Sequence, residues 1–107
     1  MKKLVVLFVV VISACSVKLA PLTQANADKA AAKYPAITLS ELNKGKETFE
    51  SKCTMCHGLK NPGKKTATKW DATVTQMVNR ANKKTEKISA NDRDLIMKYL
   101  VSMSKGN

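Results

Sequence analysis

Three segments of the chain combine a helix start signal with an apolar stripe. In each segment a Thr or Ser stands three residues before an acidic residue, and apolar residues follow at intervals of three and four. The start signals are Thr38-x-x-Glu41, Thr68-x-x-Asp71 and Ser89-x-x-Asp92. No period-two alternation typical of strands and no internal repeat is found in the sequence. The pattern therefore predicts an all-α fold with three main helices.

The apolar stripes also predict which side chains form the core. The second stripe comprises Trp70, Val74, Met77, Val78 and Ala81, and the third comprises Leu95, Ile96, Tyr99, Leu100 and Met103. Met97 lies off the third stripe, so we expect it to point away from the core. Pro62 and Gly63 separate the first two helices, because proline and glycine favour turns over helix interiors.

The first 14 residues have the layout of an export signal. Lys2 and Lys3 precede nine consecutive apolar residues, from position 4 to position 12, and a basic head before a short apolar run is typical of secretory signals. The run is shorter than the roughly 20 residues that a helix needs to cross a bilayer. A buried strand or helix is the alternative, although nothing polar alternates with these residues.

Two cleavage sites are compatible with this signal. Residues 12–15, Ile-Ser-Ala-Cys, resemble the lipobox of bacterial lipoproteins, which makes Cys15 a candidate for lipidation and membrane attachment. Residues 25–27, Ala-Asn-Ala, form an A-x-A site that would be cut before Asp28. Either site predicts a periplasmic or otherwise exported protein.

The cleavage sites suggest a division of the chain into three parts. We assign an export region to residues 1–27, a tether or an arm lying on the domain to residues 28–37, and a single domain to residues 38–107. A lipid on Cys15 would be separated from that domain by about 23 residues, which span roughly 25–30 Å when flexible.

Length and composition exclude several function classes. The chain has 107 residues, enough for one domain. Aromatic residues make up only 5% of it, which disfavours a nucleic-acid binder that stacks bases. One histidine and three cysteines leave little for a zinc site or a Ser–His–Asp triad. The formal net charge is +11, and cleavage before Asp28 would lower it to +8 by removing Lys2, Lys3 and Lys18.

The strongest chemical motif is Cys53-Thr-Met-Cys56-His57. C-x-x-C-H is the attachment pattern of c-type haem, because two thiols add across the porphyrin vinyl groups and the next residue brings an imidazole to the iron. Cys53 and Cys56 would then attach one haem c covalently, with His57 as an axial ligand of the iron. A thiol-redox pair, a zinc site and a structural disulfide are the alternatives. The thiol-redox pair expects a βαβ context, and the zinc site would have only three ligands.

At this motif the sequence resembles a known family. Residues 45–58 fit the pattern G-x-x-x-F-x-x-x-C-x-x-C-H-G, which resembles the haem-binding region of class I c-type cytochromes, and residues 95–100 resemble their last helix. The resemblance covers roughly residues 38–104. It implies a compact cytochrome c fold, with three main helices around one covalently attached haem. It also implies that Gly45 and Phe49 cross Tyr99, since glycine lets two helix backbones approach closely.

The second axial ligand is expected to be a methionine. His57 is the only histidine, and a methionine ligand raises the reduction potential of haem iron. We favour Met77, because a Trp-x6-Met segment resembles compact cytochrome domains such as those in haem-containing amine dehydrogenases. Many class I cytochromes carry this ligand further from C-x-x-C-H, which would favour Met97 here, and Met103 is a third candidate. Core packing is the alternative role for each methionine.

The resemblance also implies which residues pack around the haem. They are Phe49, Pro62, Trp70, Val74 and Tyr99. A backbone carbonyl near Asn61-Pro62 would accept the second ring N–H of His57. Trp70 would lie on the porphyrin, with its N–H within reach of a propionate. A role in the protein core is the alternative for Trp70.

These features together predict an electron carrier, not an enzyme, although it could be a subunit of a larger oxidoreductase. The alternative is a haem enzyme or sensor with an open or displaceable distal site, peroxidase-like or gas-binding. Lysines gather at Lys60, Lys64, Lys65 and Lys69 and again at Lys83, Lys84 and Lys87. They form either a solvated basic surface or one that steers the protein to an acidic redox partner protein or to anionic lipid headgroups. No nucleic-acid partner is expected.

Overall fold

The computed structural model describes residues 19–53 and 60–106, which form four α-helices and one short 3-10 helix. In chain order they are α1 (Gln24–Ala30), α2 (Leu39–Cys53), η1 (Pro62–Lys64), α3 (Ala67–Ala81) and α4 (Ala90–Met103). These two stretches contain no strand. The predicted all-α fold class is thus confirmed for the part of the chain described. Within the same part, no helix is both long enough and apolar enough to cross a membrane.

Hydroxyl caps begin α2 and α4 where the sequence predicts them. Thr38 Oγ1 accepts a hydrogen bond from the Glu41 N–H at 3.1 Å. Ser89 and Asp92 cap α4 reciprocally: Ser89 Oγ accepts from the Asp92 N–H at 3.0 Å, and the Asp92 carboxylate accepts from the Ser89 N–H at 3.2 Å. Each cap satisfies N–H groups that the first helical turn leaves without a partner.

The predicted start of α3 is wrong by two residues. Thr66, rather than Thr68, provides the cap, because Thr66 Oγ1 accepts from the Lys69 N–H at 3.3 Å. Asp71, which was expected to complete the start signal, lies 3.3 Å from the Arg93 guanidinium on α4. The sequence offers two threonines two residues apart, so the start signal alone does not decide between them.

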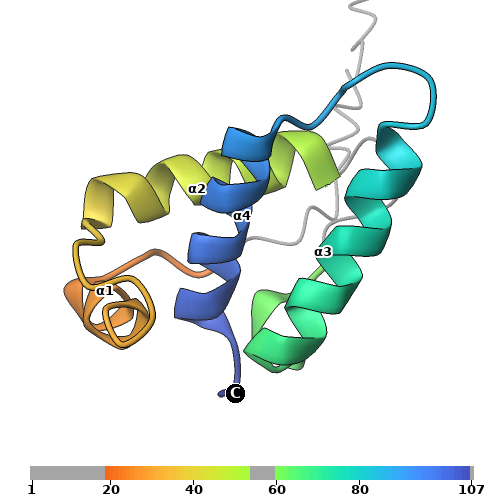
Figure 1. The fold of residues 1–107 in the computed structure, drawn as a ribbon. Helices are drawn as coiled ribbons and strands as arrows, with labels where there is room; N and C mark the ends of the chain where they lie inside the picture. Colours follow the sequence, from red (N-terminus) through yellow and green to blue (C-terminus); the bar gives the residue numbers. More distant parts are fainter. Residues whose placement is uncertain (1–18, 54–59, 107) are drawn as a thin grey trace, which may run out of the picture.

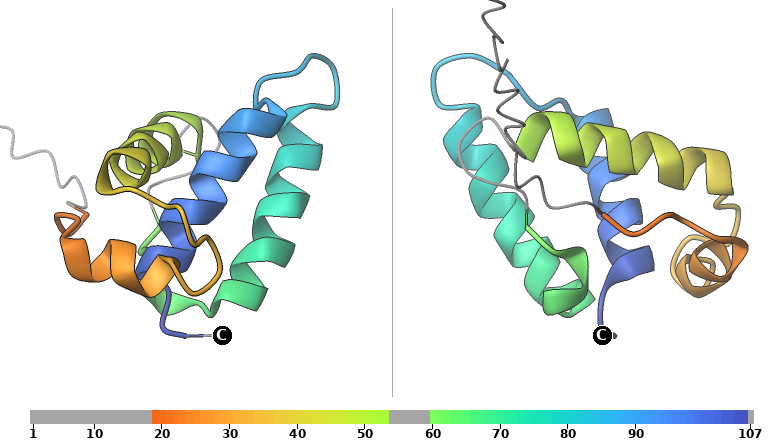
Figure 2. Two further views of the ribbon diagram at one scale, coloured as in Figure 1. Left: turned by 60° about the vertical axis from the view of Figure 1, so that its left-hand side comes forward. Right: turned by 180° about the vertical axis from the view of Figure 1, so that it is seen from behind.

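Helix α4 is the centre of the fold. It contacts α1, α2, α3 and η1, and Figure 1 shows α2 crossing it while α3 runs alongside. Figure 2 shows the same crossing from two further directions. Because neighbours surround α4 on several sides, its buried residues do not form one stripe. They are Ile96, Met97, Tyr99, Leu100, Val101 and Ser102. The expectation that Met97 points away from the core is therefore wrong: only 3% of it is exposed.

Most of the buried apolar residues belong to one group, which we call the main cluster. It comprises Phe49, Cys53, Ala67, Trp70, Val74, Ile88, Ile96, Met97, Tyr99, Leu100 and Val101. These residues come from α2, α3, α4 and the loop before α4. The main cluster is thus the region in which the three long helices meet.

Gly45 allows α2 and α4 to cross closely. A Cβ at this position would lie 2.2 Å from the carbonyl oxygen of Leu95 and 2.9 Å from Cβ of Tyr99. One turn later, the ring of Phe49 packs on the ring of Tyr99, with centroids 5.6 Å apart. The expected crossing of Gly45 and Phe49 with Tyr99 is therefore confirmed.

Helix α1 packs against α4 and α2. Its buried residues Ala27 and Ala30 form a second, small cluster with Leu42 of α2. Figure 2 shows α1 lying across the C-terminal end of α4. The segment 28–37 contains the last turn of this helix and the connection to α2.

Candidate functional site

Helix α2 carries Cys53 into the main cluster. Cys53 is the last residue of α2 and is 8% exposed. Phe49 precedes it by four residues, so the two side chains share one face of the helix. Cys56 and His57, which complete the C-x-x-C-H motif, lie outside the described residues, as does Cys15.

Three aromatic rings form an apolar wall in the same cluster. The ring of Phe49 meets the ring of Trp70 edge-on, with centroids 6.3 Å apart and an interplanar angle of 83°. It packs on Tyr99 at an angle of 46°. Edge-on and tilted pairs are favourable because the positive edge of one ring meets the negative face of the other. At most 1% of each of the three residues is exposed, so they are fixed within the core.

The indole N–H of Trp70 donates a hydrogen bond within the protein. Nε1 donates to the backbone carbonyl of Pro62 at 2.7 Å. The short helix η1 places this carbonyl, and Asn61 caps η1 by accepting from the Gly63 N–H at 2.9 Å. The sequence left two roles open for Trp70, and this bond corresponds to the role in the core. A carbonyl oxygen has two lone pairs, so the Pro62 oxygen has capacity for a second donor.

The three candidate methionines occupy different surroundings. Met77 is half-buried and packs against the main cluster, as Val74 on the same helix does. Met97 is a member of that cluster, contrary to the sequence-based expectation. Met103 is half-buried and its sulfur accepts a hydrogen bond from Asn26 of α1 at 3.3 Å. All three methionines therefore pack in or against the apolar cluster that contains Cys53, and the sulfur of Met103 also contacts α1.

The hydroxyl of Tyr99 is a buried polar group that sequence patterns did not single out. No hydrogen-bond partner for it is found among the described residues. Burial, together with a smaller contribution from the negative charge of Glu50, raises the pKa of Tyr99 to about 12. The phenol is therefore neutral at physiological pH. The spacing of residues cannot reveal such a group, because tyrosine occurs on apolar stripes whether or not its hydroxyl has a hydrogen-bond partner.

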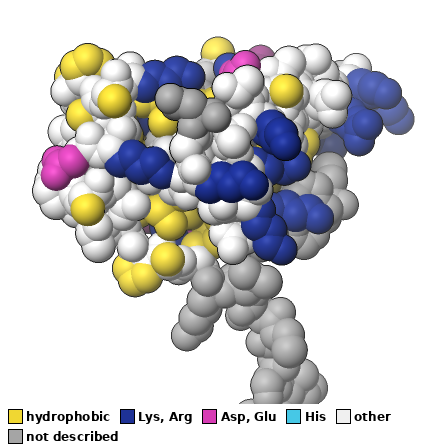
Figure 3. Space-filling view, turned by 90° about the horizontal axis from the view of Figure 1, so that it is seen from below, with side chains coloured by type: hydrophobic (Ala, Val, Ile, Leu, Met, Phe, Trp, Pro, Cys, Tyr) yellow, Lys and Arg dark blue, Asp and Glu magenta, His cyan; other side chains and the backbone are white. Residues whose placement is uncertain are grey.

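Lysines surround η1 and the start of α3. Lys60, Lys64 and Lys69 are exposed, whereas Lys65 is half-buried with its ammonium 5.7 Å from the centroid of the Trp70 ring. The lysines of the loop before α4, from 83 to 87, are exposed as well. Figure 3 shows dark-blue Lys and Arg side chains spread across one face of the molecule, with few acidic side chains among them. The expected basic surface is thus present beside the main cluster.

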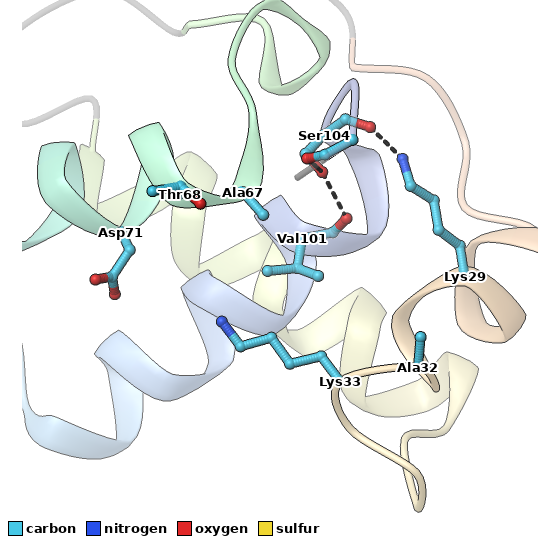
Figure 4. A pocket seen from close by; sticks show the side chains of 9 residues that line it. Lys29, Ala32, Lys33, Ala67, Thr68, Asp71, Val101 and Ser104 are labelled. Atoms are coloured by element: carbon cyan, nitrogen blue, oxygen red, sulfur yellow. Dashed lines mark hydrogen bonds between the residues drawn. The ribbon is translucent and has the colours of Figure 1, made fainter.

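A cavity of about 300 Å³ lies between α1, the start of α3 and the end of α4 (Figure 4). Its polar lining includes Lys29, Lys33, Thr68, Asp71 and Ser104. None of the site residues predicted from the sequence lines it. In the described part of the chain, no group of three or more His, Cys, Asp or Glu side chains is placed to hold a metal ion.

Comparison of the chain with protein-family models, with curated proteins and with solved structures finds no match.

Proposed function

We propose that this chain is an exported monohaem c-type cytochrome that carries single electrons between redox partner proteins. One observation carries the proposal. Helix α2 ends inside the main cluster at Cys53, the first residue of C-x-x-C-H. The same helix crosses α4 at Gly45 and Tyr99, as the family resemblance implies.

The chemistry of the described residues fits a covalently attached haem. Cys53 offers a thiol at the edge of an apolar cluster, and Phe49, Trp70 and Val74 offer flat or compact apolar surface around it. Met77 and Met97 offer neutral thioether sulfur, a ligand that suits haem iron. No Asp, Glu, Lys or Arg is buried among the described residues, which suits the low-polarity surrounding that a porphyrin ring requires.

The chain itself would hold, ligate and shield the group. Cys53 and Cys56 would attach it, and His57 would supply a nitrogen ligand, oriented by a backbone carbonyl such as that of Pro62. The aromatic wall would exclude water, and a methionine sulfur as the second protein ligand would favour the reduced state. When bound, haem supplies a one-electron couple at its iron. The basic surface beside η1 would favour acidic redox partners, since opposite charges speed encounter.

Expression of the full chain in a bacterium that matures c-type cytochromes tests this proposal. We expect the purified protein to show the reduced-minus-oxidised absorbance bands of a low-spin haem, and the haem to stay attached to the polypeptide after denaturation. Cys53→Ser should shift the pyridine haemochrome band, since only one thioether can form, and Ser51→Ala on the exposed side of α2 is the matched control. Absence of covalent haem in the unmodified chain would overturn the proposal. A spectral change on adding carbon monoxide would indicate a displaceable distal ligand, and thus an enzyme or sensor.

A further inference from the structure

Helix α1 and the residues before it are an integral part of the folded domain. Ala27 and Ala30 are 2% and 0% exposed and pack with Leu42 of α2. Leu19 and Leu22, which precede the helix, pack against the main cluster. Apolar contacts with the domain therefore extend over the whole segment from 19 to 30.

Two polar side chains of α1 donate hydrogen bonds to backbone carbonyls at the C-terminal end of α4. Asn26 Nδ2 donates to the carbonyl of Ser102 at 3.3 Å, and the Lys29 ammonium donates to the carbonyl of Ser104 (Figure 4). The last carbonyls of a helix lack partners within the helix, and a cation near them is favourable. Helix α4 has no basic residue in its own last turn, so α1 supplies this positive charge.

Cleavage before Asp28 would destroy this arrangement. It would cut α1 after its fourth residue and remove Asn26, Ala27 and both leucines that precede the helix. It would also remove Thr23, whose N–H donates to Asn26 Oδ1 at 2.9 Å at the start of the helix. The remaining three residues, 28–30, are fewer than the 3.6 that make one helical turn. The A-x-A site is therefore embedded in folded structure.

We infer that the mature protein keeps α1 and begins at Cys15 as a lipoprotein, and that the site before Asp28 is not used. In this processing the Cys15 thiol attacks the glyceryl carbon of a diacylglycerophospholipid. A carbon–sulfur bond forms, the carbon–oxygen bond to the phosphate breaks, and the phosphate headgroup leaves with the thiol proton. Water then hydrolyses the peptide bond before Cys15. The inference rests on the export part of the proposed function and is independent of haem.

Retention of α1 also shortens the connection to the membrane. The sequence alone suggested about 23 flexible residues between a lipidated Cys15 and the domain, with a span of roughly 25–30 Å. Leu19 already packs on the core, so only four residue steps remain, and a fully extended chain covers at most about 14 Å in four steps. The domain is then held next to the bilayer surface.

Intact mass spectrometry of the full chain, purified from bacterial membranes, tests the inference. We expect a mass that corresponds to residues 15–107 with attached acyl groups, and partition of the protein into a detergent phase. Cys15→Ala should abolish both. Ala25→Glu, which alters the A-x-A site at an exposed position, should leave processing unchanged. A chain that begins at Asp28 or elsewhere after Cys15, or one that keeps residues 1–14, would overturn the inference.

A second comparison tests the docking of α1 itself. Ala27→Glu and Ala25→Glu change the same A-x-A site, but only Ala27 is buried. We expect Ala27→Glu to make the segment 19–31 at least about tenfold more susceptible to limited proteolysis, because a buried carboxylate opposes docking. Equal susceptibility of the two variants would refute the docked arm. The haem spectrum of the same samples separates this inference from the proposed function, since a haem-bearing chain starting at Asp28 would refute only the former.

Discussion

The crossing of α2 and α4 makes Gly45→Ala the sharpest test of the packing. The added Cβ would stand 2.2 Å from the carbonyl oxygen of Leu95 and 2.9 Å from Cβ of Tyr99. Both neighbours belong to α4, and the nearer one is backbone, so no side-chain rotation can relieve the contact. Because non-bonded heavy atoms need about 3.5 Å, the two helices would have to separate by about 1 Å.

The expected loss of stability follows from two opposing terms. Alanine is favoured over glycine inside a helix by about 1 kcal/mol. Overpacking a core costs about 1–3 kcal/mol, and a clash with backbone belongs at the upper end of that range. We therefore expect Gly45→Ala to lower the free energy of unfolding by about 2 kcal/mol. For a domain of this size that corresponds to a fall in Tm of about 8–16 °C.

Thermal unfolding followed by far-ultraviolet circular dichroism measures this effect, with Gly63→Ala as the matched control. A Cβ at Gly63 would lie 3.4 Å from Asn61 Oδ1 and 3.7 Å from the carbonyl oxygen of Met103, which is ordinary contact. Neither Gly45 nor Gly63 has a positive φ, so backbone strain does not distinguish the two. We expect Gly63→Ala to change stability by less than about 0.5 kcal/mol. Equal Tm values for the two variants would refute the close crossing.

Three further predictions concern the main cluster. Tyr99→Phe should match or exceed the wild type at neutral pH, because it removes a buried hydroxyl without a described partner. The pKa of Tyr99 rises from 10.0 to about 12 in the folded protein, chiefly through burial, so between pH 10 and pH 12 the wild type should lose about 2 kcal/mol more stability than Tyr99→Phe loses. Trp70→Phe should cost about 1–3 kcal/mol in a denaturant titration, because it leaves the buried Pro62 carbonyl without its donor; an unchanged midpoint would contradict that role. Met77→Ala should convert the haem to a high-spin or ligand-exchanged form in absorbance spectra. If only Met97→Ala gave this result, the distal ligand would be Met97 of α4 and not Met77.

Sequence patterns predicted those features that depend on local chemistry. The Ser89 and Asp92 side chains cap α4 as expected, because a capping box involves only residues within one turn. The crossing at Gly45 was expected from the resemblance to class I c-type cytochromes and not from a local pattern, and the lack of a Cβ at Gly45 is what allows it.

Features that depend on several neighbouring elements at once could not be predicted from the sequence. Met97 lies off the apolar stripe of α4, yet it is buried because α4 has partners on several sides and no single stripe describes its core. Helix α1 is short and rich in alanine and charge, so its sequence favours a tether or an arm equally. The bonds of Asn26 and Lys29 to the end of α4 fix it in place, and those partners are more than 70 residues away in the chain.

The mass of the denatured protein is the most direct test of the proposed function. The full chain should be purified from a bacterium that attaches haem to another c-type cytochrome in the same culture, and unfolded before measurement. We predict a mass that exceeds the processed polypeptide by one haem, and loss of that increment when both Cys53 and Cys56 are replaced by serine. A polypeptide without added haem, beside a fully loaded reference cytochrome, would contradict the assignment of C-x-x-C-H as a haem attachment site.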